Sequence, residues 1–359
     1  MASWRKEGRH TISVLMRDVA KRSGVSTTTV SHVLNETRRV AEATRARVLR
    51  AAAELNYYKN TSARLLVRGQ SDLLGLIISD IENPFFPELI KSFERACAGE
   101  RLEVLLCATN YDRGHAENAL RRMLENRVRG VAVMTSQFDP ELEAHLTDKD
   151  VPLVLLGSPP ARKFRSNIAI NYRQGLSEAI RYLHKLGHRE IALATGPQDQ
   201  VSAIAFKEAA IAEMRKLGLK PFCITEGDHR PESGARAAQE LLGRSPRPTA
   251  LLCGNDRMAI GALGAAEDLG FRVPQDLSII GADDVWMTRY CHPPLTTIRI
   301  PRDLLGQLAF DVLMKMVRSK RKQGSEHVLD TRLILRGSAG EAAKNKIHMR
   351  QTTVTRANA

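Results

Sequence analysis

The chain has 359 residues, and its 54 lysines and arginines outnumber its 40 aspartates and glutamates, which gives a net charge of +14. The length allows two or three domains, and a composition of 43% hydrophobic and 26% charged residues excludes a disordered or fibrous protein. No apolar run approaches the roughly 18–20 residues of a membrane span, and the N-terminus lacks a signal-peptide segment, so we expect a cytoplasmic protein.

The positive charge is concentrated at the N-terminal end. Residues 1–70 contain 14 Lys and Arg against 5 Asp and Glu, whereas the rest of the chain contains 40 against 35. A basic segment of this kind favours a polyanionic partner, most often nucleic acid. The count alone is also compatible with a basic tail or a solvated helix face.

The first predicted elements are three short helices in residues 14–57. Within them, residues 17–35 have helix-turn-helix spacing, because Gly24 can adopt the positive φ that ends a first helix and Ser26 can cap a second. The side chains near the start of the second helix then face outward, where a recognition helix contacts base edges in the major groove. Spacing alone leaves a plain helical hairpin open, and the coincidence with the basic segment favours DNA binding.

After residue 72 short β-rich apolar runs alternate with amphipathic helical stretches. This alternation predicts parallel sheets covered by helices on both faces. About nine or ten strands are too many for one small sheet, so we predict two doubly wound lobes with a cleft between them. The apolar runs are 73–79, 103–109, 130–135, 151–157, 190–196, 222–227, 249–255 and 277–284.

These patterns divide the chain into a head and a core, joined by a hinge and flanked by two tails. The predicted boundaries are 1–12 for a flexible basic tail, 13–59 for the helix-turn-helix domain, 60–71 for the hinge, 72–338 for the core and 339–359 for a disordered tail. The predicted lobes are 72–171 with 300–328, and 172–299 with 329–338. The last tail has no leucine heptad, which argues against a coiled-coil assembly helix.

Seven segments in one collinear order carry a resemblance over residues 14–338. They are DVAKRSGVSTTTVSHVLNE, TRARVLRAAAELNYYKN, ARLLVRG, LLGLIISDIENPFFPELI, LHKLGHREIALATGP, CGNDRMAIGALGAAEDLGFRVPQDLSIIGADD and PPLTTIRIPRDLLGQLAF. The chain resembles the lactose/galactose repressor (LacI/GalR) family. The resemblance implies a small all-α head and an α/β core of two parallel-sheet lobes, similar to periplasmic binding proteins. It further implies a homodimeric repressor that binds a palindromic operator under allosteric control by a small molecule in the cleft.

The resemblance assigns DNA contacts to side chains of the head and the hinge. Thr27, Thr28 and His32 match base-reading positions. Phosphate or backbone contacts are matched by Ser26, Thr29, Ser31, Asn35, Tyr57 and Asn60. Leu66 matches a leucine that wedges into the minor groove, which bends DNA onto more protein surface, although packing against the core is the alternative for it.

Three positions of the head depart from the family pattern. The third reading position is usually arginine, and His32 stands there, so the operator is expected to differ from the common family sequence. Leu15 and Ala41 replace the usual caps of the first and third helices, and a missing cap costs about 1 kcal/mol. We therefore predict a head that is marginally stable in isolation.

Ligand contacts are expected at the carboxyl ends of the strands. These positions are Asp80, Asn83, Phe85, Asn255 and Asp283, where carboxylates and amides suit a hydroxylated ligand and a phenyl ring suits its C–H face. Asp and Asn at strand ends can also simply cap helices, and capping is the prediction for Asp256. The resemblance supports Asn255 and Asp283 as effector contacts.

Several polar contacts of sugar-binding family members are absent. Gly157 stands where an aspartate is frequent, Ile204 and Phe206 stand where arginine is frequent, and Ile300 replaces a frequently polar residue. The predicted pocket is therefore more apolar than that of a sugar-binding relative, and either the effector is less sugar-like or the protein binds none.

Other functions are weakly supported. A solute-binding protein with the same two lobes and no DNA role needs export, for which the sequence shows no signal. A phosphate-cradling loop, a dinucleotide fingerprint and a nucleophile elbow are all missing, so we expect no enzyme and no cofactor. His184 and His188 have zinc-ligand spacing, but Gly187 ends the helix between them. The five scattered cysteines predict neither a disulfide framework nor a structural zinc site.

Overall fold

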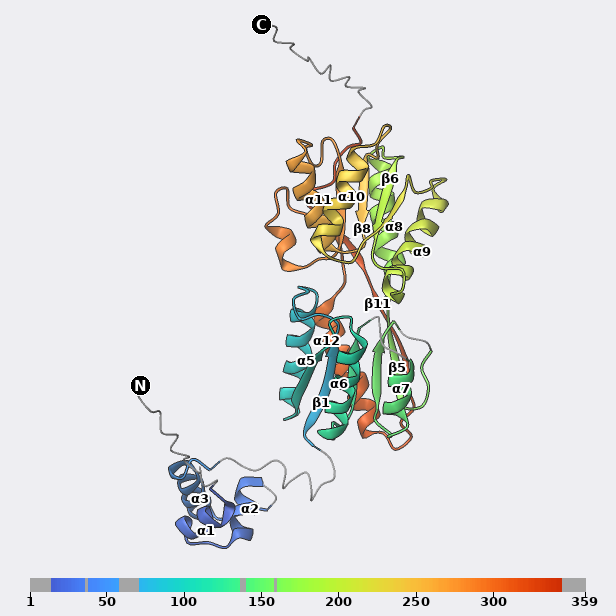
Figure 1. Ribbon diagram of the computed structural model, residues 1–359. Coiled ribbons are helices and arrows are strands. Elements are labelled where there is room, and N and C mark those ends of the chain that lie inside the picture. Colours follow the sequence, from blue (N-terminus) through green and yellow to red (C-terminus); the bar gives the residue numbers. More distant parts are fainter. Residues whose placement is uncertain (1–13, 36–37, 58–70, 136–139, 158–159, 344–359) are drawn as a thin grey trace, which may run out of the picture. The chain divides into compact units, whose positions relative to one another are not determined.

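The computed structural model describes residues 14–35, 38–57, 71–135, 140–157 and 160–343 (Figure 1). The chain divides between Ser71 and Asp72 into two compact units, a helical head and a larger α/β core. Within the described ranges no helix is both long and apolar enough to cross a membrane.

The head consists of three helices around a small apolar centre. They are α1 (Met16–Ser23), α2 (Thr27–Asn35) and α3 (Glu42–Glu54). Val19, Val30 and Val48, one from each helix, have no exposed surface and form the middle of the cluster. The sequence analysis predicted this three-helix arrangement and its helix-turn-helix spacing.

The helix ends of the head follow the predicted capping chemistry. Gly24 ends α1 at φ +67°, and the Ser26 hydroxyl accepts a hydrogen bond from the Thr29 backbone N–H at 3.1 Å. Neither Leu15 nor Ala41 supplies a side-chain cap. The Asp18 carboxylate instead accepts the Leu15 N–H at 2.8 Å, which ties down the start of α1 from within the helix.

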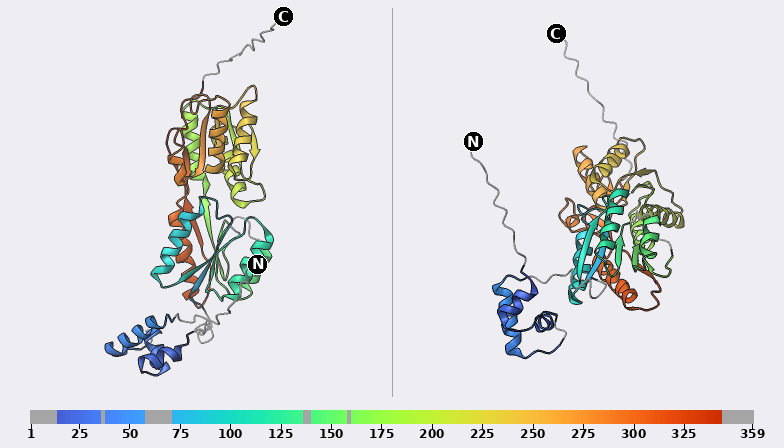
Figure 2. Two further views of the ribbon diagram at one scale, coloured as in Figure 1. Left: turned by 60° about the vertical axis from the view of Figure 1, so that its left-hand side comes forward. Right: turned by 60° about the horizontal axis from the view of Figure 1, so that its bottom comes forward.

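The core contains two six-stranded sheets, one in each lobe (Figures 1 and 2). The lobe-one sheet has the order β11-β5-β4-β3-β1-β2, and its strands are β1 (Leu73–Ile78), β2 (Glu103–Ala108), β3 (Val131–Met134), β4 (Leu153–Leu156), β5 (Arg165–Asn171) and β11 (Glu326–Asp330). The lobe-two sheet has the order β12-β10-β9-β8-β6-β7, and its strands are β6 (Ile191–Thr195), β7 (Ile224–Glu226), β8 (Ala250–Cys253), β9 (Ser278–Asp283), β10 (Thr296–Arg299) and β12 (Arg332–Ile334). All pairings are parallel except β10 with β12.

Helices cover both faces of each sheet. In lobe one, α5 (Phe86–Gly99) and α12 (Arg302–Arg318) cover one face, and α6 (Arg113–Glu125) and α7 (Pro140–Thr147) cover the other. In lobe two the two pairs are α8 (Tyr172–Lys185) with α9 (Val201–Lys216), and α10 (Pro231–Leu242) with α11 (Asp256–Asp268). Alternate residues of β1 point to opposite faces, since Leu74, Leu76 and Ile78 join one apolar cluster and Ile77 joins the other. The predicted fold of two doubly wound lobes is confirmed.

All eight predicted apolar runs form strands, whereas four further strands were not predicted. These are β5, β10, β11 and β12, which are short or carry many polar residues. In β11 exposed and partly buried residues alternate, so its sequence lacks the continuous apolar run of a central strand. The chain passes between the lobes three times, after β5, after β10 and after β11.

A short 3-10 helix, Trp286–Arg289, follows β9. In α3 the side chains of Val48, Ala51 and Ala52 are buried in the apolar cluster, whereas Leu49 is 40% exposed.

Candidate effector cavity and DNA-recognition helix

The N-terminal end of α2 presents a polar, solvent-facing surface. Ser26, Thr27 and Thr28 are exposed, and Thr29, Ser31 and His32 are partly buried. The Ser26 and Thr29 hydroxyls lie 2.9 Å apart, so the cap also orients Thr29. The structure thus places side chains with hydrogen-bonding groups where the sequence analysis expected base and phosphate contacts.

A basic hollow lies beside this surface. Its lining includes His32 of α2 together with Arg38, Arg39 and Arg45. The three arginines were not assigned in the sequence analysis, although an Arg-Arg pair directly after a recognition helix is a readable signal for phosphate contact. This hollow adds positive charge next to the exposed N-terminal end of α2.

Of the remaining residues that were predicted to contact DNA, the structure describes the side chain of Tyr57. Tyr57 is partly buried and packs against the apolar cluster of the head, and its backbone N–H bonds to Ala52 O at 2.9 Å. Asn60, Leu66 and the side chain of Asn35 lie outside the described residues.

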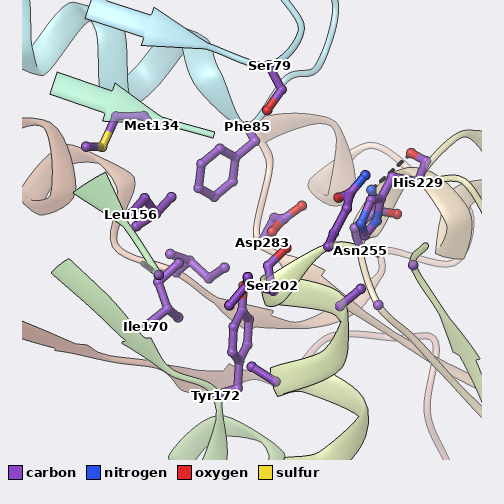
Figure 3. A pocket seen from close by; sticks show the side chains of 18 of the residues that line it. Ser79, Phe85, Met134, Leu156, Ile170, Tyr172, Ser202, His229, Asn255 and Asp283 are labelled. Carbon is purple, nitrogen blue, oxygen red and sulfur yellow. Dashed lines mark hydrogen bonds between the residues drawn. The ribbon is translucent and has the colours of Figure 1, made fainter. Parts of the chain in front are cut away.

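In the core, a cavity of about 260 Å³ opens between the two lobes. Figure 3 shows side chains from both lobes converging on it. Its lining includes four of the five predicted effector contacts, Asn83, Phe85, Asn255 and Asp283, together with residues that the sequence analysis did not assign, among them Tyr111, Tyr172, Ser202 and His229.

Lobe one supplies an apolar wall. Phe85 and Phe86 pack edge to face with ring centres 5.2 Å apart, and Met134, Leu156 and Ile170 extend the wall from β3, β4 and β5 (Figure 3). These side chains lie at or near the carboxyl ends of parallel strands, which meet at one edge of the sheet. Ligand contact with this wall is governed by shape and burial of apolar surface.

Both lobes supply polar groups to the lining, and those of lobe two include Asn255, His229 and Asp283. Asn255 caps α11 by accepting the Met258 N–H at 2.9 Å, and its amide donates to the His229 carbonyl at 3.0 Å (Figure 3). His229 Nδ1 is buried without a hydrogen-bond partner among the described residues. Burial lowers the pKa of His229 to about 4, so its ring is neutral near pH 7.

The His229 ring lies directly over a glycine. A Cβ at Gly196 would fall 2.1 Å from the ring, so a larger residue there would displace it. The absence of a side chain at Gly196 therefore leaves the space that the imidazole occupies at the cavity.

Asp283 is the one carboxylate in the described lining. It ends β9 at φ +116°, a backbone conformation that side-chain-bearing residues rarely adopt. Its carboxyl accepts no hydrogen bond from any described residue, and burial raises its pKa to about 7, against the lowering effect of Arg302. The pKa of neighbouring Asp256 is also raised well above its usual value, by burial first and by Asp283 second.

Arg302 fixes the backbone behind Asp283. Its guanidinium donates to the carbonyls of Asp283 and Asp284, the latter at 2.8 Å, and to Glu88 of α5 at 2.5 Å. Asp284 turns away from the cavity and pairs with Arg299 and Arg336, as expected for adjacent residues at a strand end.

Asp80 is not among the residues that line the cavity. Its carboxylate, from the end of β1 in lobe one, pairs with Arg257 of α11 in lobe two at 3.3 Å. Both side chains are largely buried, at 15% and 17% exposure. Asp80 thus connects the two lobes beside the cavity rather than lining it.

Two other sequence-based interpretations are wrong. Asp256 does not cap α11, a role that Asn255 fills, because it is fully buried and accepts hydrogen bonds from Thr297 and the Val285 N–H. Phe206 does not face the ligand either, since it packs in the lobe-two interior 6.1 Å from the Tyr172 ring. Ile204 is likewise absent from the lining, whereas Gly157 and Ile300 are in it.

His188 has a structural role. It is fully buried, with Nδ1 2.9 Å from the Thr249 hydroxyl and Nε2 2.9 Å from Gly340 O. No cluster of three metal-ligating side chains occurs in the part of the chain that the structure describes.

Comparisons with known proteins agree with this architecture at both ends of the chain. Residues 15–60 match the model for bacterial regulatory proteins of the lacI family, and residues 180–339 match the periplasmic binding protein-like domain. The HTH-type transcriptional repressor PurR of Proteus mirabilis (strain HI4320) is 38% identical over 330 residues, which is 91% of this chain and 97% of that protein. The chain belongs to the lacI family.

Solved structures of transcriptional regulators share the fold. The lac repressor dimer bound to operator and the anti-inducer ONPF is 30% identical and superimposes with a TM-score of 0.82, covering 91% of this chain and 99% of that one. The complex of the transcriptional regulator CelR with cellobiose is 27% identical, with a TM-score of 0.69, covering 91% of this chain and 100% of that one. The family resemblance read from the sequence is therefore confirmed.

Proposed function

We propose that this lacI-family repressor binds a palindromic operator as a homodimer and that a small molecule in the interlobe cavity sets its affinity for DNA. The observation that carries the proposal is that residues of both lobes line the same cavity. A ligand that contacts Phe85 on one side and Asp283 on the other binds one lobe angle better than another. The function places the protein in the bacterial cytoplasm, associated with the nucleoid.

The head reads DNA through the exposed end of α2. Thr27, Thr28 and His32 contact base edges, and Ser26, Thr29 and Ser31 contact or orient phosphates. We add Arg38 and Arg39 to the phosphate contacts, because both are exposed and both line the hollow next to His32. Asn35, Tyr57, Asn60 and Leu66 keep the roles that the family resemblance implies.

Control by ligand acts through the connections between the lobes. Three chain segments cross between them, and Asp80 and Arg257 add an ion pair. A change in lobe angle moves the start of β1, to which residues 58–71 join the head in sequence. Coupling between such sites typically amounts to about 1–3 kcal/mol.

The operator role is tested by selecting bound fragments from random double-stranded DNA with the full-length protein at near-physiological salt. We expect an enriched palindrome. Salt-sensitive binding without enrichment, unchanged by metabolite extract, would contradict the proposal.

Replacement of His32 tests the reading surface. His32→Ala should reduce discrimination between the selected operator and its variants by about 1–3 kcal/mol, because a base contact is lost. Arg39→Ala is the matched control, since loss of a phosphate contact weakens binding to all sequences alike and lowers the salt dependence by about one counterion. Unchanged discrimination in His32→Ala would remove His32 from the reading surface.

A further inference from the structure

The cavity is unusual in its charge. No lysine or arginine occurs among the described residues that line it, and Asp283 is the one acid there. Arg302, the cation that acts on the Asp283 carboxyl, already donates to Glu88 at 2.5 Å and to two carbonyls. A ligand with a phosphate or carboxylate group would therefore enter without a positive partner, and it would face Asp283.

Asp283 needs a donor that the protein does not provide. Its carboxyl accepts no hydrogen bond from the described residues, although it is buried at the cavity wall. A buried carboxylate without a partner is costly, and a donor or a cation brought by the ligand removes that cost. The Asp283 carboxyl oxygens can thus accept a hydrogen bond from a ligand or pair with a positively charged group of the ligand.

Most of the remaining lining suits an apolar ring. Phe85, Leu156 and Ile170 face the cavity from lobe one, and Tyr172 and Val201 continue the apolar surface. A polyol such as a hexose would leave several hydroxyls unpaired against these side chains. The volume of about 260 Å³ lies below the roughly 300–1,000 Å³ of most ligand pockets, which favours a compact ligand.

The neutral His229 completes this pattern. Burial lowers its pKa to about 4, so its ring is uncharged near pH 7 and does not repel a cation in the cavity. Near neutral pH the described lining is therefore negative or neutral, never positive.

We propose that the effector is a compact aromatic or alicyclic amine, whose protonated nitrogen pairs with Asp283 while its ring lies against Phe85 and Leu156. This inference rests on the proposed function, because it names the ligand class of the same cavity. It predicts that hexoses, nucleotides and organic acids of similar size bind poorly.

Three probes that share a phenyl ring and a short side chain, and differ in charge, separate the ligand classes. Phenethylamine carries a cation, phenethyl alcohol is neutral and hydrocinnamate is an anion. Binding of each to the full-length protein is measured by calorimetry at pH 8, with glucose and adenine as polar, uncharged probes. We expect phenethylamine to bind at least about tenfold more tightly than phenethyl alcohol, and hydrocinnamate not to bind.

The variant Asp283→Asn tests the pairing itself. Asparagine tolerates a positive φ, so this substitution preserves the strand end while removing the charge. The preference for the amine should disappear in Asp283→Asn and persist in Asp148→Asn, which removes an exposed acid beyond α7. An equal preference in both variants would overturn the role of Asp283.

The pH dependence gives a second readout of the same contact. Four groups face the Asp283 carboxyl or lie beside it: Asp256 of α11, Asp284 of β9, Arg302 of α12 and Tyr172 of α8. Asp284 is paired with Arg299 and Arg336, and burial raises the pKa of Tyr172 further above its usual value. Amine affinity should therefore rise several-fold from pH 6 to pH 8, and a flat profile would contradict the pairing.

Failure of the ligand class and failure of the proposed function give different results. Stronger binding of the alcohol, the acid, glucose or adenine than of the amine overturns the ligand class alone, as does absence of amine binding at millimolar concentration. The variants Ser202→Trp and Ala205→Leu narrow the cavity without any ligand. If operator affinity is unchanged in both folded variants and with every probe, the proposed function itself fails.

Discussion

The two lobes of the core share one architecture and present different side chains to the cavity between them. Each has a six-stranded sheet with helices on both faces. Lobe one contributes the apolar wall around Phe85 and Leu156, whereas lobe two contributes Asn255, His229 and Asp283. The comparison shows that the fold sets where a ligand binds, since both lobes offer strand ends, and that individual side chains set which ligand binds.

The largest expected effect is loss of the lobe-one wall. Phe85→Ala should lower the free energy of unfolding of the core by about 3 kcal/mol, because Phe85 is buried against Phe86 and beneath the Arg302 guanidinium. Ser202→Ala, on the lobe-two side, should change it by less than about 0.5 kcal/mol. Urea unfolding followed by circular dichroism checks both values. If both variants lost the same free energy of unfolding, Phe85 would be no more important for folding than Ser202, and this prediction would be contradicted.

Titration of His229 and Asp283 in lobe two should change the free energy of unfolding by a similar amount between about pH 4 and pH 7. The pKa of His229 is lowered by burial to about 4, so stability from the neutral ring is lost as pH falls from about 6.5 to 4. The pKa of Asp283 is raised by burial to about 7, so stability from the protonated carboxyl is lost as pH rises from about 4 to 7. The two trends oppose each other in the intact protein.

Single substitutions separate these trends. In Asp283→Asn the stability should fall as pH is lowered towards 4, and in His229→Phe it should fall as pH is raised towards 7. Each slope should reach at most about 1.4 kcal/mol per pH unit relative to the unsubstituted protein. Urea unfolding across pH 4–7 measures them, and parallel pH profiles in the two variants would show that burial does not control these groups.

The smallest effect concerns the contact between the lobes. Arg257→Met should lower the free energy of unfolding by about 1 kcal/mol, because it breaks the largely buried ion pair with Asp80. Asp80→Asn should give a similar loss, and the double variant little more, which a double-mutant cycle measures. Additive losses would mean that the two side chains stabilise their own lobes separately.

The sequence predicted the fold well where burial is continuous. The eight apolar runs became strands because each is buried on both faces of a covered sheet. The strand β5, with the sequence RSNIAIN, and the edge strand β11 were missed, because polar residues interrupt their apolar pattern. Their partners in the sheet, rather than their composition, make them strands.

The candidate site was predicted to the extent that it follows strand ends. Asn255 and Asp283 lie in the cavity because β8 and β9 were located correctly. Tyr172 was missed together with β5, the strand that it follows, and His229 was missed in the turn after the short strand β7. The positions of Asp80 and Phe206 depend on side-chain direction, which strand boundaries alone do not determine.

The glycine beneath His229 has a consequence for how the protein can evolve. Gly196 leaves a flat space that the imidazole fills, and His229 itself lies in a loop rather than in the apolar interior. A Cβ at position 196 would enter the space of the imidazole, so the place of the ring at position 229 depends on glycine at position 196. Within a shared regulator fold, a substitution at position 196 would therefore alter the cavity through a residue that carries no side chain of its own, and would leave the DNA-reading head untouched.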